Sequence, residues 1–271
     1  MTSSQPLLPP RHQSICRVHE ISWSVLLLQL NRLNEAFEAA QATHPSPEAK
    51  KIWSEARRSA AKKMRNLQDV AYVDYNTAND FLDFLKALQT GRGNPGAYET
   101  LIDSARQAVN ETDIAQEALL KFREDLRIVA GKITTLMSDD CKDMTSFQIE
   151  SSQSMLELAT AIEECNALLE EHREELKEVQ QQSLDENDNL PSEEEFQMVQ
   201  EKWLAFEEAS GPQAYKWLLL QHKMAGPDDS DEPVITSDNP RNPTRRTNLS
   251  KSRRISFWRK FFRRISSCLP N

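Results

Sequence analysis

The sequence predicts an all-α protein, in which an elongated antiparallel bundle of about four to five helices with coiled-coil-like heptad packing precedes a flexible tether and a C-terminal basic amphipathic helix. Three observations predict it. Only 6 glycines occur in 271 residues, which disfavours β-rich folds and nucleotide-binding α/β folds, because both use glycine where the backbone needs positive φ or a close approach to phosphate. Apolar residues recur every three or four positions, the spacing of one helical face. Charge is also segregated: residues 241–271 hold ten of the 33 Lys/Arg and none of the 42 Asp/Glu.

The composition divides the chain into four expected parts. Residues 1–14 are rich in Pro and Ser and are expected to be disordered. Residues 15–226 carry the helical periodicity and should form the bundle. Residues 227–249 are acidic and polar, with too little apolar surface to offset the entropy of ordering, so we expect a flexible linker. Residues 250–271 form the basic amphipathic tail.

The first two helical stretches are separated by a proline signal. Apolar residues from Leu26 to Ala40 lie on one helical face, and the pattern stops at His44 before a proline. Ser46 followed by Pro47 is a helix start, because the serine caps free N–H groups and proline is tolerated in the first turn. The second stretch runs to the glycine-rich residues 91–96, with an expected interruption at residues 72–79.

The third and fourth stretches are the longest periodic segments. The third covers about residues 98–138, and the fourth has apolar spacings that alternate strictly between three and four, which predicts a heptad seam. The seam could pack on its own chain or on a second copy, so a homo-oligomer stays open. His172 on this seam is interpreted as a polar residue that sets register rather than as a ligand or base. The seam comprises Met155, Leu158, Ile162, Cys165, Leu169, His172, Leu176 and Val179.

A capping box opens the fifth stretch, since Ser192 is followed three residues later by Glu195. We expect this helix to pause at Gly211 and Pro212 and to end at Gly226, which precedes a second proline.

The tail carries the clearest functional signal. On a helical wheel, the apolar residues of segment 252–269 fall within one arc of about 140°, and most of the cations lie opposite. Aromatic residues on one side and guanidinium groups on the other are typical of a helix that lies in the headgroup plane of an anionic membrane. The residues expected to bind the membrane are Lys251, Arg253, Arg254, Ile255, Phe257, Trp258, Arg259, Lys260, Phe261, Phe262, Arg263, Arg264, Ile265 and Leu269.

Three other interpretations of the same residues stay open. The apolar stripe could pack on the acidic body as an ordinary surface helix. Ile255 and Phe262 have the one-to-eight spacing of some calmodulin targets, but no third anchor follows. The cluster around Arg245 and Lys251 could be a nuclear-localisation signal, which would leave the aromatic residues unexplained. Nucleic acid is the least favoured partner, because the rest of the chain is acidic.

Three tail residues are candidates for covalent modification. Ser256 and Ser266 each follow Arg-Arg-Ile, the pattern of kinases that require upstream basic residues, and phosphorylation would oppose membrane docking. Cys268 lies fourth from the end, but Pro270 and Asn271 depart from the prenylation pattern. Palmitoylation fits Cys268 better, and an unmodified thiol is the default.

The sequence contains no recognisable catalytic, nucleotide-binding or metal-binding motif. The four cysteines are scattered without ligand spacing, which indicates reduced thiols in an intracellular protein. No segment is apolar over enough residues to span a bilayer. We therefore expect no enzyme, no cofactor and no metal, and a cytoplasmic location peripheral on a membrane, with the nucleus as an alternative.

The favoured function is that of a helical adaptor, scaffold or regulator that binds a protein partner through its bundle and anionic membranes through its tail. One alternative is a membrane-disrupting protein of the pore-forming or cell-death type, by analogy of architecture only. Another is a soluble coiled-coil interaction protein whose tail binds calmodulin or nucleic acid. Because the tail is basic and the body acidic, self-association should compete with docking.

Overall fold

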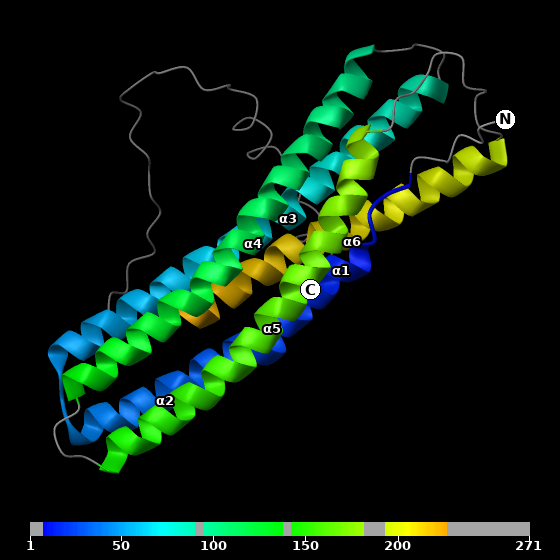
Figure 1. Ribbon diagram of the computed structural model, residues 1–271. Coiled ribbons are helices and arrows are strands. Elements are labelled where there is room, and N and C mark those ends of the chain that lie inside the picture. Colours follow the sequence, from blue (N-terminus) through cyan, green and yellow to red (C-terminus); the bar gives the residue numbers. More distant parts are fainter. Residues whose placement is uncertain (1–7, 90–94, 138–141, 182–192, 227–271) are drawn as a thin grey trace, which may run out of the picture. The chain divides into compact units, whose positions relative to one another are not determined.

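The computed structural model describes residues 8–89, 95–137, 142–181 and 193–226, and all of them belong to the first of two compact units, Met1–Asp228 and Asp229–Asn271 (Figure 1). The described residues contain helices and no strands, which confirms the all-α prediction. The helices are α1 (His12–Ile21), the π-helix η1 (Ser22–Leu26), α2 (Leu27–Thr43), α3 (Pro47–Gln89), α4 (Pro95–Met137), α5 (Lys142–Gln181) and α6 (Glu193–Ala225).

Local signals in the sequence explain where α2 ends and α3 begins. Ser46 Oγ accepts a hydrogen bond from the backbone N–H of Ala49 over 3.2 Å, as an N-cap serine does. Gln41 Oε1 in turn accepts the backbone N–H of Ser46 over 3.0 Å, so the turn between the two helices is held by side chains. The first helix begins at His12, three residues before the expected start of the bundle.

Consecutive long helices run antiparallel. Lys63 of α3 pairs with Asp125 of α4, whereas Asp80, further along α3, bonds to Ser104, which lies earlier in α4. Pairs between α4 and α5 and between α3 and α6 have the same reversed order. The first helices, α1 and α2, run along α5 and α6, so the described helices form one bundle with α4 between α3 and α5 (Figure 1).

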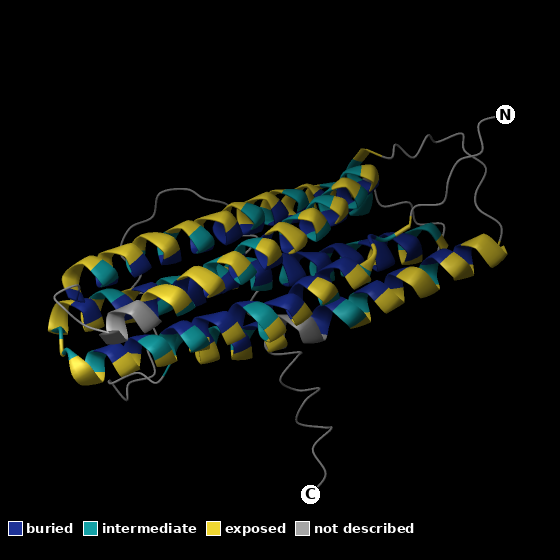
Figure 2. Ribbon diagram, turned by 60° about the horizontal axis from the view of Figure 1, so that its bottom comes forward, coloured by how far each residue is buried: buried dark blue, intermediate teal, exposed yellow. Residues whose placement is uncertain are grey.

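The core consists of the inward sides of all these helices, and Figure 2 shows buried residues on those sides and exposed residues on the outer ones. Phe81 of α3 and Trp203 of α6 stack with their ring centroids 4.1 Å apart. On the seam predicted in the fourth helical stretch, every seam residue from Leu158 to Val179 is buried within this chain, and Met155 is half-buried. Burial of the seam therefore needs no second copy.

Two expected interruptions are wrong. Helix α3 continues through residues 72–79, and α6 continues through residues 211–212. Gly211 lies inside the helix at a close contact with α3: a Cβ there would lie 3.3 Å from Cδ2 of Tyr75. The glycine lets α6 approach α3 closely, and the apolar stripes on both sides of it stabilise the continuous helix.

Candidate interaction surfaces

The residues predicted to bind the membrane lie in the tail, outside the described residues, as do Ser256, Ser266 and Cys268. Among the helices that the structure does describe, none combines the length and the apolar character needed to cross a bilayer. The surfaces that the structure describes are those of the helical bundle.

The last turn of α6, at the end of the described residues, is fixed to α3. Arg57 Nε donates to the carbonyl oxygen of Met224 over 3.1 Å, and Nη2 donates to that of Lys223 over 3.4 Å. Terminal helix carbonyls lack intrahelical partners, so a guanidinium group satisfies them well. Gly226 then adopts φ +80°, and a Cβ there would lie 2.6 Å from the Arg57 guanidinium carbon. Both the conformation and the space require glycine.

Arg57 also reaches the second helix. Its Nη1 donates to Asn34 Oδ1 over 3.1 Å, and the same oxygen accepts the indole N–H of Trp53 over 2.8 Å. Burial lowers the pKa of Arg57 from its ordinary value, and the charge of Glu38 partly opposes this effect. Arg57 thus joins α2, α3 and α6 at the point where the described chain ends.

The N-terminal half of α3 is strongly basic. Residues 47–65 contain seven Lys/Arg and two Glu. Four of the cations are exposed and fall within an arc of about 60° on the helical wheel, because they are spaced by seven, four and three residues. They form no ion pair with any described residue. We call Lys51, Arg58, Lys62 and Arg65 the cationic stripe.

Helix α4 extends this surface on one side. Asp125 of α4 pairs with Lys63 of α3 over 2.7 Å, which brings the adjacent rows of the two helices together. Lys121 and Lys132 follow the Asp125 row at helical spacing, are exposed and have no ion-pair partner in the described part of the chain. Ile128 and Leu136 on the same side of α4 are 42% and 41% exposed. We call the stripe together with these four residues the cationic face.

Helix α5 has the opposite character. Residues 150–178 contain nine Glu, one Lys and one Arg. Several of these carboxylates bind the N-terminal segment: Arg11 Nη1 donates to Glu171 over 2.9 Å, and Arg17 pairs with Glu164 over 3.1 Å. Hydrogen bonds that Arg17 donates to Glu164 and Glu20 raise the pKa of Arg17. Part of the acidic surface therefore anchors α1.

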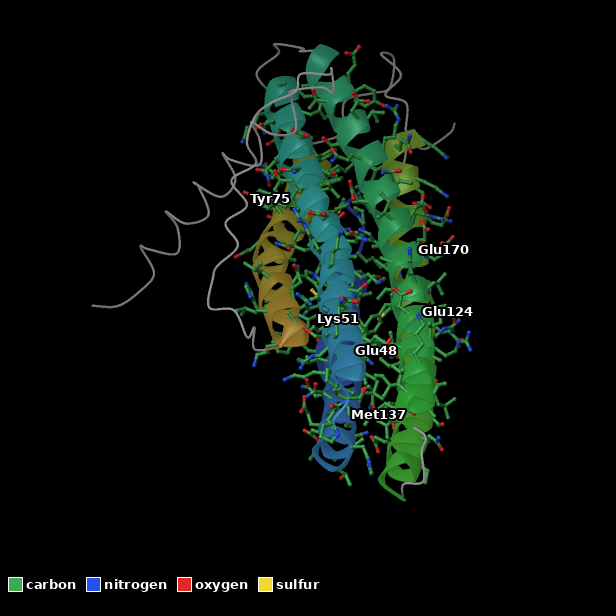
Figure 3. The ribbon with its side chains drawn as sticks, turned by 90° about the vertical axis from the view of Figure 1, so that its left-hand side faces the viewer. Glu48, Lys51, Tyr75, Glu124, Met137 and Glu170 are labelled. Atoms are coloured by element: carbon green, nitrogen blue, oxygen red, sulfur yellow. The ribbon has the colours of Figure 1, made fainter. Side chains whose placement is uncertain are left out.

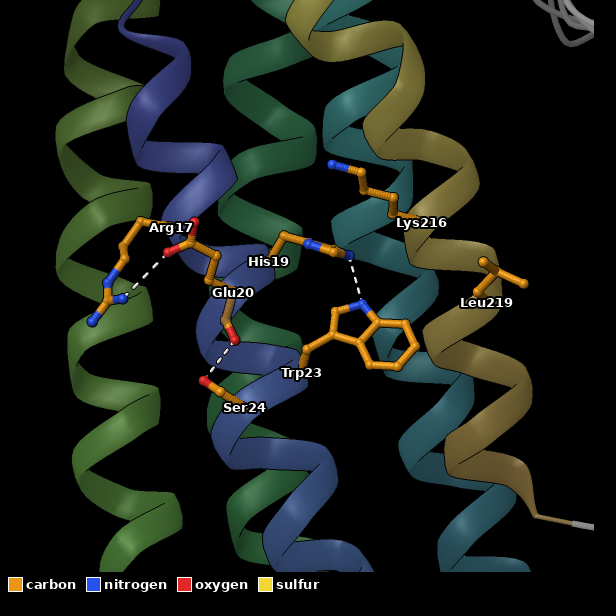
Figure 4. A pocket seen from close by; sticks show the side chains of 7 residues that line it. All are labelled: Arg17, His19, Glu20, Trp23, Ser24, Lys216 and Leu219. Carbon is orange, nitrogen blue, oxygen red and sulfur yellow. Dashed lines mark hydrogen bonds and ion pairs between the residues drawn. The ribbon is translucent and has the colours of Figure 1, made fainter. Parts of the chain in front are cut away.

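An open depression of about 610 Å³ lies between α1, η1 and α6 (Figure 4). The π-helix at its edge contains two serines with hydroxyl groups bonded to the preceding turn: Ser22 Oγ donates to the Val18 carbonyl over 2.8 Å and Ser24 Oγ to that of Glu20 over 2.7 Å. Such bonds to the residue four positions earlier compete with the α-helical ladder. The depression is lined by Arg17, His19, Glu20, Trp23, Ser24, Lys216 and Leu219.

His19 at this depression is held as a neutral imidazole. Its Nε2 accepts the indole N–H of Trp23 over 2.7 Å, and its ring meets that of Trp217 edge-on with centroids 4.9 Å apart. Burial, followed by the charge of Lys216, lowers the pKa of His19 to about 4. An imidazole that accepts an N–H and contacts aromatic rings serves here to dock α1 on α6.

The histidine of the predicted seam belongs to a buried hydrogen-bonded pair. His172 Nε2 lies 3.1 and 3.0 Å from the two carboxylate oxygens of Asp74, and both side chains are fully buried. The His172 ring also stacks on Phe206, with centroids 6.4 Å apart. The contacts of His172 with Asp74 and Phe206 join α5, α3 and α6, and the sequence pattern alone did not reveal Asp74 as the partner.

The described residues contain no group of three or more His, Cys, Asp or Glu side chains that could hold a metal ion. Known proteins provide no further guide, since no family model and no curated protein matches the sequence.

Proposed function

We propose that the protein is a non-enzymatic helical adaptor, scaffold or regulator that anionic membranes recruit through residues 250–271. The observation that carries the proposal is the segregation of the tail sequence, which places aromatic and aliphatic residues on one helical arc and most of its cations on the other. The bundle would then bring a protein partner to the membrane, and we expect a cytoplasmic protein that is peripheral on the bilayer.

The energies of such a tail favour reversible binding. Each Lys or Arg near an anionic leaflet contributes about 1 kcal/mol. Burial of Trp258, Phe261 and Phe262 in the interface would add about 1.5 to 3 kcal/mol for each side chain that is fully buried. The acidic remainder of the chain opposes part of this attraction, so docking should depend steeply on salt and on the anionic lipid content.

Co-sedimentation of the full-length protein with vesicles tests the proposal. Vesicles that contain phosphatidylserine should pellet the protein at low salt, and neutral phosphatidylcholine vesicles should not. The triple substitution Trp258→Ser, Phe261→Ser and Phe262→Ser should abolish pelleting, although it leaves the charge unchanged. Failure of the unchanged protein to pellet, together with binding to a soluble acidic partner such as calmodulin, would overturn the proposal.

Dye release separates recruitment from membrane disruption. An adaptor should bind phosphatidylserine vesicles that contain a self-quenched dye without releasing it. Release that depends on Trp258 and Phe261 would instead support the pore-forming alternative.

Phosphorylation offers a test of regulation at the same site. Two phosphates at Ser256 and Ser266 would each add about −1.5 to −2 charge and should release the protein from vesicles. Treatment with a kinase that recognises basic residues, compared between the natural chain and the double Ser→Ala variant, isolates this effect.

A further inference from the structure

We propose that the cationic face of α3 and α4 is a second membrane-binding surface, which takes the anionic headgroups of phospholipids and orients the bundle against the bilayer. The inference rests on the proposed function, since it concerns a protein already recruited to a membrane by its tail.

The charges of this face are available to a partner. The stripe cations Lys51, Arg58, Lys62 and Arg65, with Lys121 and Lys132 of α4, are exposed and have no ion-pair partner among the described residues. Several exposed cations elsewhere on the bundle are paired at short range, as in the pair between Arg127 and Glu124 over 2.7 Å. Glu55, which is exposed on the same side of α3, offsets one of these six charges, so the face keeps a net positive charge that attracts an anionic surface.

The geometry of the stripe suits an extended surface rather than a single small anion. From Lys51 to Arg65 the helix advances 14 residues, or about 21 Å at about 1.5 Å per residue. Figure 3 views the bundle with α3 in front, between α6 and α4, and labels Lys51 on α3. A row of cations along one helix can contact several headgroups at once.

The apolar residues of the face favour a membrane over nucleic acid. Ile128 and Leu136 are each about two-fifths exposed, beside Lys132 on the same side of α4. Aliphatic side chains that enter the interface between cationic ones gain from burial in lipid. A nucleic-acid phosphate backbone is contacted by polar and charged groups, so such a partner would not bury the side chains of Ile128 and Leu136.

The exit of the chain supports the same orientation. Arg57, which holds the last turn of α6, directly precedes Arg58 of the stripe. The described chain therefore ends, at Gly226, beside the basic half of α3. The largest concentration of carboxylates lies on α5, which packs on the opposite side of α4 from α3.

Vesicle titration of the full-length protein tests the proposal. Substitution of the four stripe cations by Gln should weaken binding to phosphatidylserine vesicles about tenfold or more, because each contributes to the attraction. The matched control replaces four exposed cations outside the face by Gln: Lys86, Arg106, Arg127 and Lys202. It removes the same charge and should change binding less than about twofold. Circular dichroism and a thermal melt verify that both variants are folded.

A positional readout makes the result independent of affinity. An environment-sensitive fluorophore on Ser54→Cys, on the exposed side of α3, should report a less polar environment when vesicles are added. The same label on Thr160→Cys, on the exposed side of α5, should not respond. Both variants are made in a chain whose natural cysteines are replaced by Ala.

The outcomes separate the two proposals. If the unchanged protein does not bind vesicles, the proposed function fails. If it binds through the tail while the stripe variant equals its control and the Ser54 label is silent, the second surface does not exist and the proposed function stands. If the stripe variant loses binding to duplex DNA but keeps its affinity for vesicles, the face is a nucleic-acid site and the inference is overturned.

Discussion

The guanidinium group of Arg57 on α3 donates to the carbonyl oxygen of Met224 in the last turn of α6, across 3.1 Å and 167 residues of sequence. The contact fixes the end of the bundle from which the tail departs. Its removal leaves terminal carbonyls and Asn34 without a charged donor in a half-buried site.

Arg57→Ala should therefore destabilise the bundle by about 1.5 to 3 kcal/mol, the usual loss for hydrogen bonds to a charged group. The neighbouring Arg58→Ala is the matched control, since Arg58 is exposed and unpaired within the described residues, and it should change stability by less than about 0.5 kcal/mol. Urea denaturation followed by circular dichroism measures both. Equal midpoints would contradict the role of Arg57.

Two glycines provide an internal comparison. Gly226→Ala should destabilise by about 1 to 3 kcal/mol, because alanine at φ +80° is strained and its Cβ meets the Arg57 guanidinium. Gly131→Ala, inside α4, meets nothing within 4 Å and should stabilise by about 0.5 to 1 kcal/mol. Thermal melts of the two variants should shift in opposite directions. Shifts of the same sign would show that this account of Gly226 is wrong.

The effects of replacing His172 and Asp74 should be non-additive. His172→Leu leaves a buried polar group of Asp74 without its hydrogen-bond partner, and we expect a loss of about 1 to 3 kcal/mol. The double variant His172→Leu and Asp74→Leu removes both polar groups and should recover most of that loss. A double-mutant cycle by urea denaturation measures the coupling, and additive losses would mean that the two groups do not interact.

Acid should weaken the contact of α1 with α6. The pKa of His19 is about 4 in the folded protein against an ordinary value of 6.5. Between these values the unfolded chain binds more protons than the folded one, so the stability contributed by neutral His19 is present above about pH 6.5 and is lost as the pH falls towards 4.

The expected loss between pH 7 and pH 5 is about 1 kcal/mol, after allowing for solvent at the rim of the depression. His19→Gln keeps a hydrogen-bond acceptor for Trp23 but does not titrate, so this part of the pH dependence should vanish. Urea midpoints of both proteins at the two pH values test it. The same pH slope in both proteins would assign the effect to other groups.

Cys165 should be chemically inert in the folded protein. Burial raises the pKa of its thiol to about 12, so that very little thiolate exists at neutral pH. Iodoacetamide should label the half-exposed Cys16 first and Cys165 only after urea is added. Peptide mapping by mass spectrometry distinguishes the two, and rapid native labelling of Cys165 would indicate local opening of α5.

Regular apolar spacing was sufficient to predict most of the described fold. The seam from Leu158 to Val179 was predicted from spacing alone, and the Ser46 cap was predicted from local chemistry. Breaks were predicted less well, because glycine and proline signal a stop only when no tertiary contact favours the helix. At Gly211 the close approach of Tyr75 decides the outcome, and that contact joins residues far apart in sequence.

The candidate surfaces and the contacts of the two histidines were not predicted from the sequence, for two different reasons. The spacing of seven, four and three residues between the cations of the stripe could have predicted this surface. The net charge of the acidic part of the chain does not show it, because that sum does not distinguish one helix face from another. The partners of His172 and His19 had no such signal, because Asp74 and Trp217 come from other helices. Only packing brings these pairs together.

The salt bridge between Arg11 and Glu171 has a consequence for synthesis on the ribosome. These residues are 160 positions apart in the sequence. At a synthesis rate of about 5 to 20 residues per second, Glu171 is made roughly 8 to 30 seconds after Arg11. During that interval Leu26, Leu30 and Leu33, which the finished bundle buries, have no α5 to cover them. The nascent chain should therefore be a client of ribosome-associated chaperones until translation has passed α5.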